Sequence, residues 1–259
     1  MSKPELHSGA DRCHEAAAKT LWSQWSVIGG QVGGRVREAT ALVDPEALLL
    51  FSCALRGYEP RLWDLVGGLV AEAPSLLSVQ RTRNLAAQFP ANVRNVLAEV
   101  ASIAVNDGKD ARWRPLVGTA VARAYRAKKV FEPTRHVTET AALTLRLRLA
   151  FGVHARTDAL AFLLAIAPSS ATAKEIAEAT GYGEMPVRRG LDAIANARII
   201  DADGTRPTQY HAVPANWRYL LGAGNGRLVW HHWHSLFAFL AHAFELGDQA
   251  PLKKRSAYL

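Results

Sequence analysis

Two short helices joined by a glycine-containing break are the feature that most constrains the fold of this chain. Thr172 is followed three residues later by Glu175. A hydroxyl and a carboxylate at this spacing form a capping box, in which each side chain accepts a hydrogen bond from a free backbone N–H at the helix start. The helix that begins there is interrupted at Thr180-Gly181-Tyr182-Gly183, because glycine readily takes the positive φ of a sharp turn. The stretch therefore predicts a helix, a tight turn and a second helix.

The second helix is predicted to begin at residue 184 or 185 and to end at residue 197. Pro186 fits its first turn, where the missing N–H of proline costs no hydrogen bond. Val187, Leu191 and Ile194 have the i, i+4, i+7 spacing of a buried stripe. The opposite face is predicted to point outward, and it carries Met185, Arg188, Arg189, Asp192 and Asn196.

A β-hairpin is predicted directly after this helix pair. Residues 198–200 and 209–213 are two short runs that favour strands, and the turn sequence Asp203-Gly204-Thr205-Arg206-Pro207 lies between them. Residues 157–166 form an apolar segment that predicts a further helix in front of the pair.

This order of elements resembles the winged helix-turn-helix superfamily of bacterial transcriptional regulators. The resemblance covers residues 155–221, about a quarter of the chain, and no family is recognised over the whole chain. It implies that helix 185–197 enters the major groove of DNA and that the hairpin, the wing of the family, meets the backbone or minor groove around residues 203–207.

We therefore expect a sequence-specific regulator that binds double-stranded DNA, acting as a transcriptional repressor. Arginine is suited to base reading because its guanidinium makes two hydrogen bonds to guanine. The candidate DNA-binding residues are Lys174, Met185, Arg188, Arg189, Asn196, Arg206 and Arg156. Because Glu184 and Asp192 share these faces, an alternative stays open, in which the winged helix is the protein-binding module of an interaction or antitoxin-like subunit.

The uneven distribution of charge favours a polyanionic partner. Residues 1–110 contain 11 Lys and Arg against 12 Asp and Glu, whereas residues 111–259 contain 20 against 11. The basic excess therefore belongs to the half of the chain that holds the predicted winged helix, and long-range attraction to nucleic acid follows from such an excess.

The rest of the chain predicts a mainly α fold. Residues 1–10 are polar and are expected to be flexible. Residues 11–130 are predicted to form an all-α domain, whose clearest helix start is Asp44-Pro45-Glu46, a cap followed by a first-turn proline and acid. Ser75 is expected to cap a later helix of this domain. Residues 131–221 would then form the winged helix-turn-helix domain, with a leading helix over 137–151 whose Arg146 and Arg148 could add phosphate contacts.

The last part, residues 222–259, is predicted to hold an aromatic helix and a basic tail. Residues 227–246 include Trp230, Trp233, Phe237, Phe239 and Phe244. A helix that is apolar nearly all round must be buried, and two burial sites remain open: packing under the N-terminal domain, or packing in a homodimer. A homodimer would suit a regulator, because two recognition helices can read two half-sites.

Neither enzyme nor cofactor motifs are apparent. The chain contains no Walker ending, no Gly-x-Ser-x-Gly elbow and no His-Glu-x-x-His, so we expect no catalysis, no cofactor and no metal, with the histidines at 231–242 serving structural roles. An active site in the helical N-terminal domain is a weaker third hypothesis, and a deep polar pocket there would be its sign. Without a signal peptide or an apolar run long enough to span a bilayer, the protein is expected to be cytoplasmic.

Overall fold

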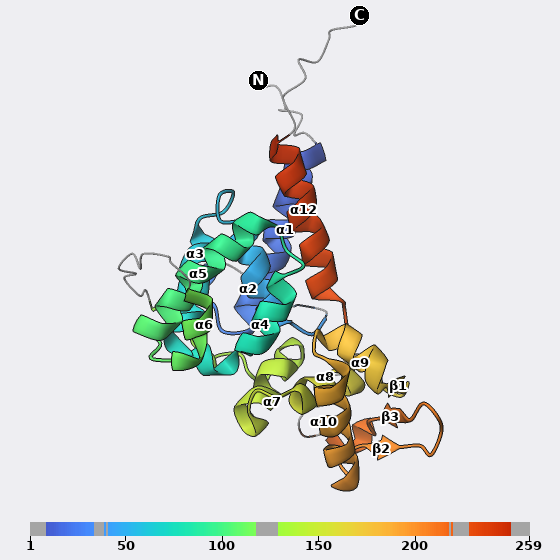
Figure 1. Cartoon of the computed structure of the whole chain (residues 1–259). Coiled ribbons are helices and arrows are strands. Elements are labelled where there is room, and N and C mark those ends of the chain that lie inside the picture. The colour runs from blue at the N-terminus through green and yellow to red at the C-terminus, as the bar shows by residue number, and fades with distance from the viewer. Residues whose placement is uncertain are drawn as a thin grey trace, which may run out of the picture.

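The computed structural model describes residues 9–33, 39, 41–117, 129–217, 219 and 228–249. The chain is mainly helical, with one small three-stranded antiparallel sheet (Figure 1). Of residues 1–10, which were expected to be flexible, residues 1–8 lie outside the described residues, and residues 9 and 10 instead begin the first helix. The expected basic tail also lies outside the described residues. No helix in the described ranges has the length and apolarity that a bilayer span requires.

The N-terminal helices pack around α2, whose residues Pro45–Cys53 are all buried. Their bounds are α1 Gly9–Val27, α2 Pro45–Ala54, α3 Arg61–Glu72, α4 Val79–Ala86, α5 Ala91–Asn106 and α6 Arg114–Val117. Asp44 caps α2 as predicted, since its side chain accepts the Ala47 N–H. The prediction of Ser75 as a cap is wrong: residues 74–76 form a 3-10 turn, and Ser78 caps α4 instead.

The second half begins with α7 (Leu143–Phe151) and α8 (Ala155–Ile166), followed by α9 (Ala173–Thr180) and α10 (Glu184–Asn196). The predicted capping box at Thr172 and Glu175 is present at the start of α9. Gly181 has a φ of +71° at the end of α9, so the turn uses the backbone freedom that the sequence indicates. The predicted stripe Val187, Leu191 and Ile194 is buried.

The small sheet consists of β1 (Ala171–Thr172), β2 (Asp201–Ala202) and β3 (Gln209–His211), in the order β1-β3-β2. The prediction that the first hairpin strand spans 198–200 is wrong. Arg198 takes a φ of +60°, and the Ile199 N–H donates to the Ile194 carbonyl oxygen, so these residues close α10. The strand begins only after them, and Asp201 pairs with His211.

The C-terminal helix α12 (Trp233–Gln249) packs against α2. It runs along α1 and away from α9 (Figure 1), and the rings of Phe244 and His14 stack at 3.9 Å. The predicted start at residue 227 is wrong. The Leu42 N–H donates to the Val229 carbonyl oxygen, and the Trp233 indole donates to the Leu42 carbonyl oxygen at 2.8 Å. These bonds hold residues 229–232 against residue 42, so the helix starts at Trp233.

Two hydrophobic clusters organise the described residues. One joins the N-terminal helices to the inner face of α12. The other is built from α7 to α10 and the sheet, with Leu42 added from the N-terminal part. Helix α7 contributes to both clusters, through Leu145 to the first and through Leu147 to the second.

Candidate nucleic-acid interface

The outward face of α10 carries the predicted recognition residues. Arg188, Arg189 and Asn196 are exposed, and Met185 is 58% exposed. They are presented on a helix whose other face is fixed by burial of Val187 and Leu191. The face is therefore both rigid and accessible, which suits a surface that docks into a groove.

Lys174 and Arg188 come together at a surface cleft of about 190 Å³ between the starts of α9 and α10 and the wing. Its lining residues are Thr172, Ala173, Lys174, Glu184, Arg188, Pro207, Thr208 and Tyr210. Arg206 immediately precedes this lining and is exposed. The cleft thus joins the candidate residues Lys174 of α9 and Arg188 of α10, and the hairpin contributes Pro207, Thr208 and Tyr210 to its wall.

Arg156 lies beside α10 on α8. A Cβ placed on Gly190 would come within 2.8 Å of the Arg156 Cβ, so α8 and α10 approach each other closely there. The Arg156 side chain itself is exposed. Glycine at position 190 allows this arginine to flank α10.

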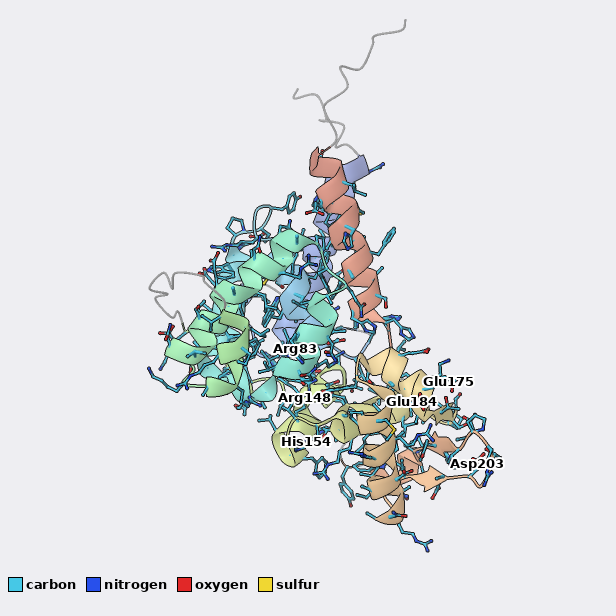
Figure 2. All side chains as sticks on the ribbon, viewed as in Figure 1. Arg83, Arg148, His154, Glu175, Glu184 and Asp203 are labelled. Carbon is cyan, nitrogen blue, oxygen red and sulfur yellow. The ribbon has the colours of Figure 1, made fainter. Side chains whose placement is uncertain are left out.

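Acidic side chains share the same region. The Arg188 guanidinium donates to the Glu184 carboxylate one turn earlier, and this hydrogen bond raises the pKa of Arg188 above its ordinary value. Between residues 171 and 211 the chain has five Lys and Arg against six Asp and Glu. In Figure 2 the labelled Glu175, Glu184 and Asp203 lie on the sheet side of the α9–α10 pair, and His154 lies on the other side. The interface is mixed in charge rather than uniformly basic.

Polar contacts made by Tyr210 and by Asp203 fix the hairpin, which is the predicted wing. The Tyr210 hydroxyl donates to Asp192 of α10 at 2.7 Å; burial together with this contact raises the pKa of Tyr210 to about 12. Asp203 accepts the Gln209 N–H at 2.8 Å and the Thr205 hydroxyl at 2.7 Å, and these bonds lower the pKa of Asp203. The loop that carries Arg206 is therefore held in one position relative to α10.

A group of five buried charges, here termed the buried ion cluster, was not predicted from the sequence. It consists of Asp44, Glu46, Arg81, Arg148 and Asp158. Arg81 bonds both oxygens of Asp44 at 2.6 Å and one oxygen of Glu46 at 2.5 Å. Arg148 bonds both oxygens of Glu46, at 2.7 and 3.0 Å, and both of Asp158, at 2.8 and 2.6 Å. Each guanidinium is thus satisfied by two carboxylates.

The buried ion cluster attaches the turn between α9 and α10 to the N-terminal helices. Arg81, on α4, donates through Nε to the Thr180 carbonyl oxygen at 2.5 Å. The Tyr182 hydroxyl donates to Asp158 at 2.9 Å. A Cβ on Gly181 would lie 2.6 Å from the Leu85 Cδ2 of α4. The orientation of α10 is consequently set by contacts with the N-terminal part of the chain.

The expectation that Arg148 could contact phosphate is wrong, because its side chain is fully buried and paired. Burial alone would lower the pKa of this guanidinium, but Asp158 and Glu46 raise it well above its ordinary value. Arg148 therefore stays charged and pairs with carboxylates in the interior of the protein.

A cavity of about 380 Å³ lies between α1 and α3, within the N-terminal helices. Trp22 and Arg61 line it, with the Arg61 guanidinium 4.8 Å from the centre of the Trp22 ring. Arg61 is also bonded to Glu59, and Lys19, at the same cavity, is paired with Glu15. Its basic groups thus already have acidic partners.

Comparison of the chain with protein-family models, with curated proteins and with solved structures finds no match.

Proposed function

We propose that this protein is a winged helix-turn-helix regulator that binds double-stranded DNA sequence-specifically and represses transcription by occupying its site. In this proposal α10 enters the major groove and places Arg188 and Arg189 next to the base edges. The wing brings Arg206 to the backbone or minor groove, and Lys174 and Arg156 contact phosphates on either side.

The observation that carries the proposal is an amphipathic α10 with its buried stripe inside and two adjacent arginines outside. The order α8, β1, α9, α10, β2, β3 supports it, because this is the order of helices and strands in winged helix domains. Pairing between Tyr210 and Ala171 places β1 beside the hairpin and next to the α9 start, so the exposed groups of three elements converge on one face.

A titration of the full chain with its DNA site tests the role of α10. The double change Arg188→Ala, Arg189→Ala is expected to weaken binding roughly tenfold or more, since each bidentate base contact contributes strongly to discrimination. The matched control is Arg83→Ala, Arg94→Ala, which removes the same charge from exposed positions on α4 and α5. Equal affinities for the two double variants would rule out α10 as the recognition helix.

The mixed charge around α10 favours one alternative, in which the same face binds a protein, as in an interaction or antitoxin-like subunit. Salt dependence distinguishes the two functions. Each phosphate contact that the protein forms should steepen the log–log salt slope by about 0.9 for duplex DNA, because condensed counterions are released. A partner protein bound at this mixed face would show a shallow slope, because paired opposite charges on the face largely cancel at long range.

A further inference from the structure

The outward face of α12 is an uncovered apolar stripe. Leu236 is 45% exposed, and Phe239 and Leu246 are each 68% exposed. Ala243, between the last two, is exposed as well. The four positions follow one another at intervals of three, four and three residues, which is the spacing of the a and d positions in a coiled-coil seam.

The stripe is also free of formal charge. The exposed side chains between residues 235 and 247 are Ser235, Leu236, Phe239, His242, Ala243, Leu246 and Gly247. Glu245 lies at the flank and is half-buried. An apolar, uncharged helix face of this kind is unusual on a chain with a formal net charge of +8, since solvent-facing helix surfaces normally carry charged residues.

The inner face holds α12 firmly in place. The Phe237 ring stacks on Phe51 of α2 at 4.5 Å, and Trp233 stacks on Phe237 at 5.1 Å. Phe237, Ala238 and Ala241 are buried in the N-terminal cluster. The inner face of α12 therefore packs under the N-terminal helices and fixes the position of the helix. The outer stripe is thereby held as a preformed surface.

We propose that this stripe is the surface through which two copies of the chain associate, with α12 packed against α12. Identical heptad seams complement each other, and neither copy brings a formal charge into the contact. Ala243 and Gly247 are small enough to let the helix backbones approach closely. An anionic surface such as a membrane or nucleic acid would instead favour cations on the face, and α12 presents none between Ser235 and Gly247.

The apolar area of the stripe determines how tightly the two copies of the chain associate. Its three large side chains leave on the order of 300 Å² of apolar surface per chain, so two stripes would bury roughly 600 Å², about half of the smallest standard interface. Flanking contacts must supply the remainder. We therefore expect a reversible dimer whose population depends on protein concentration.

Sedimentation velocity of the full chain without DNA tests this association. The wild type is expected to shift from the mass of one chain toward twice that mass as concentration rises. The double change Phe239→Glu, Leu246→Glu should keep the chain monomeric, because it brings four carboxylates into the seam. Phe151→Glu is the matched control: it alters an aromatic side chain on α7 that is 49% exposed and should dimerise as the wild type does.

A cysteine cross-link gives an independent readout in a Cys13→Ser background. Ala243→Cys is expected to form an intermolecular disulfide under mild oxidation, because residue 243 would lie at the centre of the seam. Ala91→Cys, at an exposed position at the start of α5, should not form an intermolecular disulfide. A wild type that stays monomeric throughout, or a double variant that dimerises as well as the wild type, would overturn the proposal. Neither result depends on DNA, so the proposed DNA binding is tested separately.

Discussion

Replacing Arg81 by methionine should destabilise the whole molecule while leaving its surface unchanged. The side chain is 3% exposed. It makes three charged hydrogen bonds to Asp44 and Glu46 and a fourth to the Thr180 carbonyl oxygen. Methionine fills similar space but leaves Asp44 buried without its cation, and it detaches the α9–α10 turn from α4.

The free energy of unfolding is expected to fall by about 3–5 kcal/mol, which is the range for removing one partner of a buried ion pair and leaving the other charge uncompensated. For a chain of this size each kcal/mol corresponds to roughly 2–4 °C in melting temperature, so the midpoint should fall by about 6–20 °C. The loss of stability exceeds that of a neutral hydrogen bond, because Arg148 would then be the one cation left in the buried ion cluster for three carboxylates.

Urea unfolding followed by tryptophan fluorescence measures this cost. The matched control is Arg83→Met, two residues away on α4 (labelled in Figure 2), where the side chain is exposed. The control should stay within about 0.5 kcal/mol of the wild type. An Arg81→Met protein as stable as the Arg83→Met protein would refute the conclusion that the buried ion cluster holds the two halves together.

Three further outcomes follow from the same geometry. Gly181→Ala should lower the free energy of unfolding by about 1–3 kcal/mol, because φ is +71° and the new Cβ would clash with α4. At Gly183 no neighbouring atom comes nearer than 3.5 Å to an added Cβ, so Gly183→Ala should lower it by less than about 1 kcal/mol in the same urea assay. Glu184→Gln should tighten DNA binding roughly two- to fivefold by releasing Arg188 from its ion pair, and weaker binding in a low-salt titration would contradict this. Burial would raise the pKa of Asp44, but its guanidinium partner lowers it below 3.8; the stability from Asp44 is therefore present above its unfolded pKa and lost as pH falls through the lower folded value. Urea midpoints should drop between about pH 5 and pH 2, and Asp44→Asn should flatten that drop.

Local signals in the sequence were sufficient where neighbouring residues decide the structure. The capping box at Thr172, the cap at Asp44 and the buried stripe of α10 each depend on side chains within one or two turns, and all are present. The mainly helical fold follows from such signals as well.

Boundaries were mispredicted where a distant contact or an unusual backbone conformation decides them. Arg198 was expected in a strand, but its positive φ ends α10 and moves the strand to Asp201. Residues 227–246 were expected to be helical, but residues 228–232 are not, because one hydrogen bond joins Leu42 to Val229 and another joins the Trp233 indole to Leu42. Neither effect has a signature in the local pattern of apolar residues.

The buried ion cluster could not be inferred from spacing, because Glu46 and Arg148 are 102 residues apart. Arg148 lies in an alternating Leu-Arg run that is typical of a solvated face, yet α7 is buried on both sides by the two hydrophobic clusters. One signal was present: Asp158 is a single acid among the apolar residues of α8. Such an acid needs a buried cation, although the sequence does not indicate which one.

The most direct test of the central claim is selection of DNA duplexes from a random pool by the full chain. If α10 reads base edges, one site should be enriched over successive rounds, and the Arg188→Ala, Arg189→Ala protein should fail to enrich it while the Arg83→Ala, Arg94→Ala protein succeeds. A wild-type protein that enriches no sequence, or a recognition variant that enriches the same site as the wild type, would contradict the account.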